Sequence, residues 1–176
     1  MHPATPLSAF GAVVIMGVAG SGKSSIARDV ARSLAWPVIE GDDFHSLDNL
    51  RKMRKGIALT DADRAGWLDA LARALCRHPG GAVLACSALK RAYRDRLRVA
   101  VPRLRFAYLD IAQELAHQRV LARAGDHLFP PSLVASQFAT LEDPREEEGV
   151  LTLDASLSLP ALTAGVVDWI SKTEPA

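Results

Sequence analysis

The sequence predicts an α/β domain of three layers, in which a five-stranded parallel sheet lies between helices on both faces. Short apolar runs rich in β-branched residues alternate along the chain with segments whose apolar residues recur at helical spacing. Parallel strands need such helical crossovers, and the helices then cover both faces of the sheet. A glycine-rich loop separates the first apolar run from the first helix. The 176 residues are enough for one domain, 1–176, with a full core.

The glycine-rich loop spans residues 17–24 and matches the phosphate-binding pattern G-x-x-x-x-G-K-[ST] in full. The apolar run before it, residues 12–16, is typical of a buried strand, and the residues after it have the spacing of a helix. Glycines let the backbone turn so that successive N–H groups point at phosphate oxygens. The residues expected to hold the nucleotide are Gly17, Val18, Ala19, Gly20, Ser21, Gly22, Lys23, Ser24 and Ser25. An ordinary glycine-rich turn is the alternative, and the flanking strand and helix disfavour it.

Lys23 and Ser24 carry the chemistry of this loop. The Lys23 ammonium is expected to lie against the β- and γ-phosphates of ATP, as a catalytic cation. The Ser24 hydroxyl is expected to be a ligand of Mg²⁺, and the helix that begins near Lys23 adds its N-terminal dipole. The sequence therefore predicts ATP and Mg²⁺ as cofactors.

Two adjacent carboxylates follow the second predicted strand, residues 37–40. Asp42 and Asp43 lie just past the carboxyl end of this strand, at the edge where ligands bind in open α/β sheets. One carboxylate is expected to hold Mg²⁺ through water or to accept a proton from an attacking hydroxyl, and Asp42 is the candidate for both roles. A solvated turn whose aspartates cap a helix is the alternative interpretation.

Two helices are predicted between this turn and the third strand. Residues 46–55 carry a run of charges typical of a solvated helix face. Thr60 is expected to be the N-cap of the next helix, in a capping box with Asp63. Trp67 lies on the apolar face of that helix, so it is expected in the core rather than at a binding platform.

A basic segment follows the third predicted strand, residues 82–86, in which Cys86 is expected to be a small core residue. The helix predicted to begin at Ser87 places four cations on one stripe, namely Lys90, Arg91, Arg94 and Arg98. The stripe is either a surface face or an arm for a carboxylate or phosphate, formed by the first three of these residues.

Two more strands, at 105–110 and 150–153, and three more helices complete the predicted fold. The first of these helices ends near Arg123, the second spans 132–141 and the third spans 159–170. The acidic residues 142–149 are expected to form a solvated turn.

A lid is predicted at about 119–138, because residues 124–131 are rich in glycine and proline. Arg119 and Arg123 lie one helical turn apart before this loop. Arg123 is a candidate catalytic cation and Arg119 a candidate nucleotide ligand. Solvation of both, or pairing with Asp126 and Glu114, is the alternative.

Composition excludes several classes of protein. The net charge of +1 and the absence of a long basic stripe disfavour nucleic acid as a partner. No apolar run is long enough to span a bilayer, and the first ten residues lack the architecture of a signal peptide. Cys76 and Cys86 are too few for a disulfide framework or a zinc site. A cytoplasmic protein is therefore expected.

The chain resembles the P-loop gluconokinases, of the thermoresistant type, from about residue 13 to 154. The resemblance rests on the loop 17–24, on 41–45 with Asn49, Lys52, Met53 and Gly56, on 59–64 with Trp67 and Leu68, on 86–91 with Tyr93 and Arg94, and on 136–142. The loop alone fits many enzymes, whereas the segments at Gly41-Asp42-Asp43 and Cys86-Ser87-Ala88-Leu89-Lys90-Arg91 are far more specific.

The resemblance implies a fold like that of nucleoside monophosphate kinases, often dimeric, and ATP-dependent phosphorylation of D-gluconate on its 6-hydroxyl. Under this interpretation the substrate-binding residues are Asp43, His45, Lys90, Arg91 and Arg94. A kinase for shikimate or a nucleoside monophosphate is the first alternative, and the segment from Cys86 to Arg94 disfavours it. A nucleotide-dependent switch is the second, and the chain lacks the Asn-Lys-x-Asp segment that recognises guanine.

Overall fold

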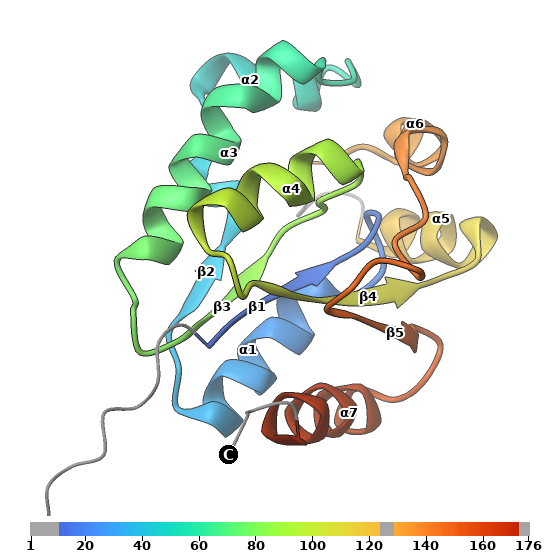
Figure 1. The fold of residues 1–176 in the computed structure, drawn as a ribbon. Coiled ribbons are helices and arrows are strands. Elements are labelled where there is room, and N and C mark those ends of the chain that lie inside the picture. Colours follow the sequence, from blue (N-terminus) through green and yellow to red (C-terminus); the bar gives the residue numbers. More distant parts are fainter. Residues whose placement is uncertain (1–10, 124–128, 173–176) are drawn as a thin grey trace, which may run out of the picture.

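The structure is a computed structural model, which describes residues 11–123 and 129–172. Its strands and helices alternate in the predicted order (Figure 1). In chain order they are β1 (Ala12–Met16), α1 (Lys23–Leu34), β2 (Val38–Glu40), η1 (Gly41–Phe44), α2 (Leu47–Arg54), α3 (Asp61–Cys76), β3 (Ala82–Ala85), α4 (Arg91–Ala100), β4 (Arg105–Asp110), α5 (Gln113–Ala122), η2 (Pro131–Leu133), α6 (Val134–Thr140), β5 (Val150–Asp154) and α7 (Leu159–Lys172).

The five strands form one parallel sheet in the order β2-β3-β1-β4-β5. Ile15 of β1 pairs with Ala85 of β3 on one side and with Ala107 of β4 on the other. The chain leaves β1 toward β2 on one side of the sheet and later returns to β4 on the other. The carboxyl end of β1 is therefore the topological switch point, where α/β sheets bind their ligands.

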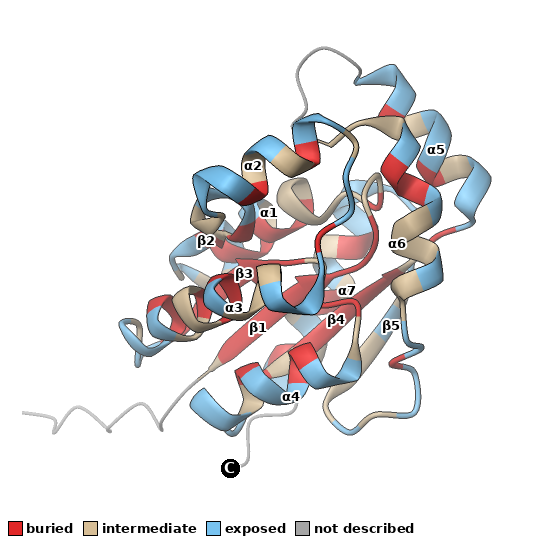
Figure 2. Ribbon diagram, turned by 90° about the horizontal axis from the view of Figure 1, so that it is seen from above, coloured by how far each residue is buried: buried red, intermediate tan, exposed pale blue. Residues whose placement is uncertain are grey.

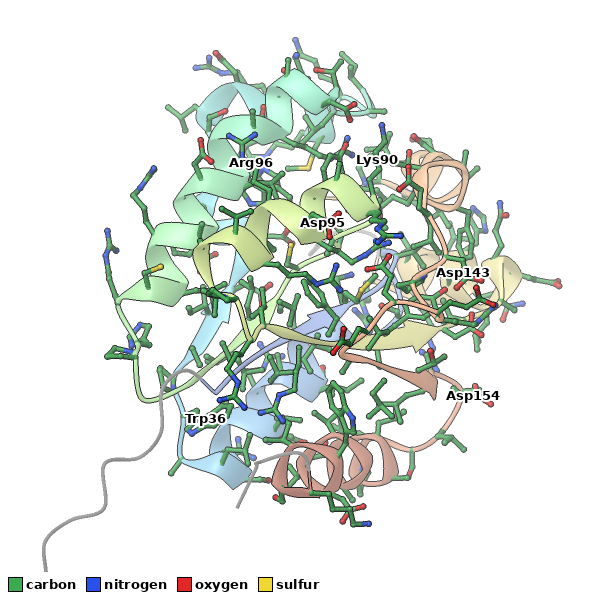
Figure 3. All side chains as sticks on the ribbon, viewed as in Figure 1. Trp36, Lys90, Asp95, Arg96, Asp143 and Asp154 are labelled. Carbon is green, nitrogen blue, oxygen red and sulfur yellow. The ribbon has the colours of Figure 1, made fainter. Side chains whose placement is uncertain are left out.

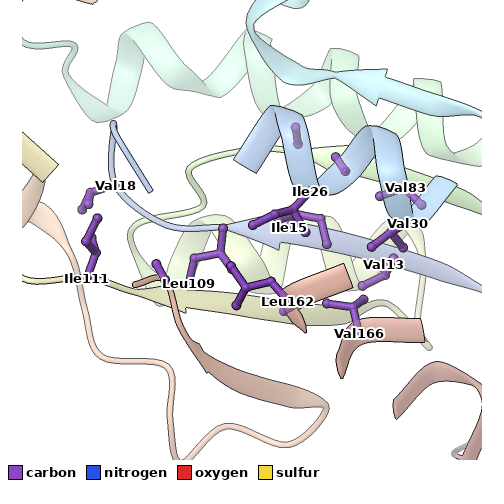
Figure 4. Close-up of a cluster of buried hydrophobic side chains, with 14 of the residues drawn as sticks. Val13, Ile15, Val18, Ile26, Val30, Val83, Leu109, Ile111, Leu162 and Val166 are labelled. Carbon is purple, nitrogen blue, oxygen red and sulfur yellow. The ribbon is translucent and has the colours of Figure 1, made fainter. Parts of the chain in front are cut away.

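Both faces of the sheet are buried, because alternate side chains of each strand point to opposite faces. Val13 and Ile15 of β1 lie in a core with α1 and α7 (Figure 4), whereas Val14 and Met16 lie in a second core with α3 and α4. All four side chains have no exposed surface, and Figure 2 shows the central strands as buried along their length. The three-layer fold predicted from the sequence is confirmed. No helix of the described ranges is long and apolar enough to cross a bilayer.

The predicted capping box at the start of α3 is confirmed. The amide of Asp63 donates to Thr60 Oγ1 at 3.1 Å, and the Thr60 amide donates to the Asp63 carboxylate at 2.9 Å. The Lys52 ammonium lies 2.7 Å from the same carboxylate, and its bond, followed by that of the Thr60 amide, lowers the pKa of Asp63 to about 2. This local set of bonds fixes the direction in which α3 leaves the loop before it.

The helix predicted from Ser87 begins four residues later, at Arg91. Ala88 has a φ of 45°, in the left-handed region that interrupts a helix. The carbonyls of Ala88 and Leu89 accept hydrogen bonds from the Arg94 guanidinium at 2.7 and 3.0 Å. A side-chain donor thus takes the place of helical N–H groups, and residues 87–90 form a loop at the carboxyl edge of the sheet.

Candidate active site

A cavity of about 300 Å³ lies at the carboxyl edge of the sheet, within the usual size range of small-molecule sites. Its walls come from the loop after β1, the ends of β2 and β3, the start of α3, and the segment that leads into α6. The lining residues used below are Ala19, Gly20, Gly22, Lys23, Ser24, Ser25, Arg28, Glu40, Asp42, His45, Arg64, Trp67, Cys86, Arg123 and Gln137. Most of the predicted phosphate-binding residues therefore face one cavity, while Gly17, Val18 and Ser21 are buried behind the loop.

The phosphate-binding loop, residues 17–24, is packed so closely that glycine is required within it. Gly20 has a φ of 82°, and a Cβ there would lie 2.5 Å from the carbonyl oxygen of Ala116 in α5. The backbone conformation and this contact both exclude a larger residue. The hydroxyl of Ser21 donates to the Val18 carbonyl at 2.8 Å and ties the loop to itself.

The start of α1 directs donors and a cation at the cavity. Its N-cap, Gly22, has no side chain that accepts from the first amides of the helix, so those amides can receive an anion. The Lys23 ammonium donates to the Val18 carbonyl at 2.9 Å. Burial lowers the pKa of Lys23, and the negative charges of Asp42 and Glu40 oppose this shift. A partly buried ammonium beside helical amides that have no side-chain cap can bind a polyphosphate.

Among the residues that the structure describes, Glu40 and Asp42 are the carboxylates that line the cavity. Glu40 ends β2 and is hydrogen-bonded to the Ser24 hydroxyl. Burial raises the pKa of the Glu40 carboxyl, and the bond from Ser24 opposes this shift. Sequence analysis missed Glu40, although its position at the carboxyl end of a strand is the relevant signal.

Asp43, predicted to face the substrate, is exposed and lies outside the cavity lining. The reason is the short helix η1, which the sequence pattern did not reveal. In a 3₁₀ helix with three residues per turn, adjacent side chains point about 120° apart. Asp42 therefore reaches the cavity, whereas its neighbour does not.

His45, which is predicted to bind the substrate, lies beside Asp42 in the cavity lining. Its Nε2 is 3.9 Å from Asp42 Oδ1, and its ring stacks on Trp67 with the ring centroids 4.4 Å apart. Burial lowers the pKa of His45, Asp42 opposes the shift, and Arg64 adds to it. Trp67 is in the core, as predicted, and its indole N–H donates to the Gly41 carbonyl at 2.8 Å. It also forms part of the cavity wall, which was not expected.

Cys86 forms part of the cavity wall. Its thiol is buried, as expected for a small core residue. Burial raises its pKa to about 12, so it stays protonated at neutral pH. It is a wall residue rather than a nucleophile.

The predicted lid arginines are divided between two positions. Arg123 lines the cavity, and its positive charge helps to lower the pKa of Lys23. Arg119 instead donates to the carbonyls of Gly20, at 3.4 Å, and Ala155, at 3.1 Å, so it supports the phosphate-binding loop from outside. Residues 124–128 of the predicted lid, including Asp126, lie outside the described residues. Lid closure stays a prediction.

Gln137 of α6 is a site residue that sequence analysis missed. Its Oε1 accepts from the amide of Ala19 in the phosphate-binding loop at 2.8 Å, across 118 residues of sequence. The last part of the predicted lid, 119–138, is thus bonded directly to the loop. Only the folded chain reveals this contact, because no local pattern marks a glutamine as a partner of a distant amide.

The predicted substrate arm is not formed, because Arg94 is buried in a structural ion pair. Its guanidinium contacts the Glu147 carboxylate at 2.5 to 3.1 Å, and Arg98 donates to the same carboxylate at 2.9 Å. The residues 142–149 are therefore not simply a solvated turn, since Glu147 anchors them to α4. Burial raises the pKa of Glu147, but the bonds from Arg94 and Arg98 outweigh this effect and the pKa lies below its usual range.

Replacing Glu147 with glutamine is expected to lower the free energy of unfolding by about 3–5 kcal/mol, because Arg94 stays buried without its counter-charge. Urea denaturation at pH 7 measures the change, and Glu146→Gln, at an exposed neighbour, should stay within about 0.5 kcal/mol. Folding lowers the pKa of Glu147, so its ion pair stabilises the protein fully above the pKa that this carboxyl has in the unfolded chain. The stabilisation is lost as the pH falls through the pKa of the folded state. Equal stability of the two variants at pH 7 would contradict the assignment.

Lys90 and Arg91 also lie outside the cavity lining. The Lys90 ammonium pairs with Asp61 at 2.9 Å, and Figure 3 shows its side chain at the beginning of α4. Arg91 is exposed, and its backbone amide donates to Glu142 at 2.7 Å. The cation that does line the cavity near His45 is Arg64, which sequence analysis did not assign to the site.

The sequence and the fold both match known kinases. The model of the AAA domain family matches residues 13–146. The thermoresistant gluconokinase of Escherichia coli is 40% identical, with 90% of this chain and 93% of that protein covered. A gluconokinase of Gluconobacter oxydans is 44% identical over 79% of each chain.

Similarity to a solved structure leads to the same family. The crystal structure of a gluconokinase from Sinorhizobium meliloti has a TM-score of 0.84 and 40% identity, with 92% of each chain covered. The agreement of sequence, fold and phosphate-binding loop over nearly the whole length shows that this chain belongs to the gluconokinase family of P-loop kinases.

Proposed function

We propose that the protein transfers the γ-phosphoryl group of ATP to the 6-hydroxyl of D-gluconate and so forms 6-phospho-D-gluconate. The observation that carries this proposal is that one cavity contains both a phosphate-binding loop and, beside it, Asp42 and His45. A phosphate donor and a hydroxyl-bearing acceptor can meet there. The gluconokinase relatives identify the class of acceptor.

The loop fits ATP and Mg²⁺. The amides at the start of α1 and the ammonium of Lys23 would hold the β- and γ-phosphates, while Arg123 adds positive charge near the transferring group. Ser24 and Glu40 would hold Mg²⁺, which neutralises phosphate charge when bound. The described residues contain no group of three or more His, Cys, Asp or Glu side chains arranged for a metal. That fits Mg²⁺, which takes few protein ligands and completes its shell with phosphate and water.

Asp42 is the proposed general base. As the 6-oxygen of gluconate forms its bond to the γ-phosphorus, its proton passes to the Asp42 carboxylate and the bond to the bridging oxygen of ADP breaks. His45 lies beside this carboxylate, and burial lowers the pKa of its imidazole and so favours the neutral form. The ring can then donate a hydrogen bond to one sugar hydroxyl or accept one from another. Its stacking on Trp67 fixes the plane of the ring.

An ADP-release assay with Mg-ATP tests the proposed reaction. Gluconate should support turnover well above that with other sugar acids, shikimate or nucleoside monophosphates. The first alternative, a shikimate or nucleotide kinase, predicts the reverse order. Faster turnover with shikimate or any nucleoside monophosphate would overturn the assignment, and gluconate-independent ADP release would favour a nucleotide-dependent switch. The cytoplasmic location, the homodimer and the absence of a nucleic-acid or membrane partner stay predictions.

A further inference from the structure

Arg64 lies in the first turns of α3 and lines the cavity together with His45. Among the described residues, Arg64 is the one lining cation that comes from α3, whereas Lys23 and Arg28 come from α1 and Arg123 from the end of α5. Arg123 acts on Lys23, at the phosphate-binding loop, whereas Arg64 acts on His45, beside the proposed base. Arg64 is thus placed with the acceptor rather than with the phosphates.

The guanidinium of Arg64 is held in place by one of its nitrogens. Its Nη1 donates to the Leu59 carbonyl at 2.5 Å and to the Tyr93 hydroxyl at 3.4 Å, and its carbon lies 5.5 Å from the centre of the Tyr93 ring. Both hydrogen bonds that this guanidinium makes within the described ranges come from Nη1. The Nε and Nη2 edge is therefore available for a ligand.

The acidic neighbour of Arg64 is engaged elsewhere. Asp61 accepts a short hydrogen bond from the Tyr93 hydroxyl and is paired with the Lys90 ammonium at 2.9 and 3.1 Å. These bonds lower the pKa of Asp61 and keep its carboxylate ionised toward Tyr93 and Lys90. Tyr93 in turn orients Arg64. Asp61, Tyr93 and Lys90 are therefore positioning residues, and Arg64 is the cation that they present.

We propose that Arg64 binds the carboxylate of the acceptor and makes the site selective for sugar acids over neutral polyols. This inference rests on the proposed function and adds the residue that reads the acid group. One edge of a guanidinium can form two parallel N–H···O bonds with a carboxylate. A neutral group in the place of the carboxylate would accept weaker bonds. With Asp42 at the reacting hydroxyl and His45 between them, the acceptor would lie with its carboxylate toward α3.

A pair of substrates tests this role, because D-gluconamide has the shape of D-gluconate without its charge. In Arg64→Gln the KM for gluconate should rise about 10- to 100-fold, the size expected for bonds to a charged group. The KM for ATP should stay unchanged, and the preference for gluconate over gluconamide should largely disappear. Arg64→Lys keeps the charge but loses the planar pair of N–H donors. Its KM for gluconate should lie between those of the wild type and Arg64→Gln. Arg73→Gln, at an exposed position of the same helix, is the matched control.

The outcomes separate this inference from the proposed function. If the wild-type protein does not phosphorylate gluconate, the proposed function and this inference both fail. If the wild type is active and Arg64→Gln keeps the wild-type KM for gluconate and the wild-type preference over gluconamide, only the role of Arg64 is overturned. Should Arg64→Gln fail to fold, as judged by circular dichroism, Arg64→Lys decides by the same two measurements.

Discussion

Replacing Lys23 with alanine is expected to reduce gluconate phosphorylation below detection while the protein stays folded. Lys23 is partly buried at the base of the phosphate-binding loop, and its ammonium donates to the Val18 carbonyl of that loop. Negative charge on the transferring phosphoryl group is stabilised by cations already in position. Removing one such preorganised group typically costs 10²- to 10³-fold in kcat, even though Arg123 also lines the cavity.

The Lys23→Ala experiment needs a control for folding and for charge. Circular dichroism and the melting temperature should stay near wild type, because the ammonium makes a single hydrogen bond, to the Val18 carbonyl. Lys55→Ala removes the same charge from an exposed position at the end of α2, and it should keep wild-type kcat. A folded Lys23→Ala protein with near-normal kcat would exclude the proposed role of the loop.

The local structures that sequence analysis predicted correctly are specified by neighbouring residues. The phosphate-binding loop is a continuous segment, so its strand, glycines and helix start can all be read together. The capping box of Thr60 is likewise complete within four residues. Arg123 was selected from local features too, because it lies one helical turn after Arg119 within the predicted lid, and its catalytic role stays a prediction. In each case the information that fixes the structure lies within one or two turns of chain.

The parts that were wrong depend on contacts between distant residues. The basic stripe of α4 was predicted from spacing alone, but the role of Arg94 is decided by Glu147, 53 residues away. A stripe of cations has the same spacing whether a carboxylate from another segment covers it or not. Arg64 and Gln137 were missed for the same reason, since their partners Tyr93 and Ala19 are 29 and 118 residues distant.

Asp42 and Glu40 are expected to give different kinetic defects, which separates the two carboxylates of the cavity. In Asp42→Asn the shape is kept but the proposed base is lost, so kcat should fall by about 10²-fold or more with little change in the KM for gluconate. Glu40 is bonded to Ser24, on the proposed metal side of the site. In Glu40→Gln the main defect should be a higher Mg²⁺ concentration for half-maximal rate.

Asp43→Asn completes the comparison, because Asp43 adjoins Asp42 in sequence but lies outside the cavity lining. It loses the same charge on the same short helix, so a general electrostatic effect of η1 would appear in both variants. Steady-state rates at several Mg²⁺ concentrations measure all three proteins. Wild-type kcat in Asp42→Asn would exclude it as the base. A loss in Asp43→Asn as large as that in Asp42→Asn would show a general electrostatic effect of η1 and would contradict a specific role of Asp42 as the base.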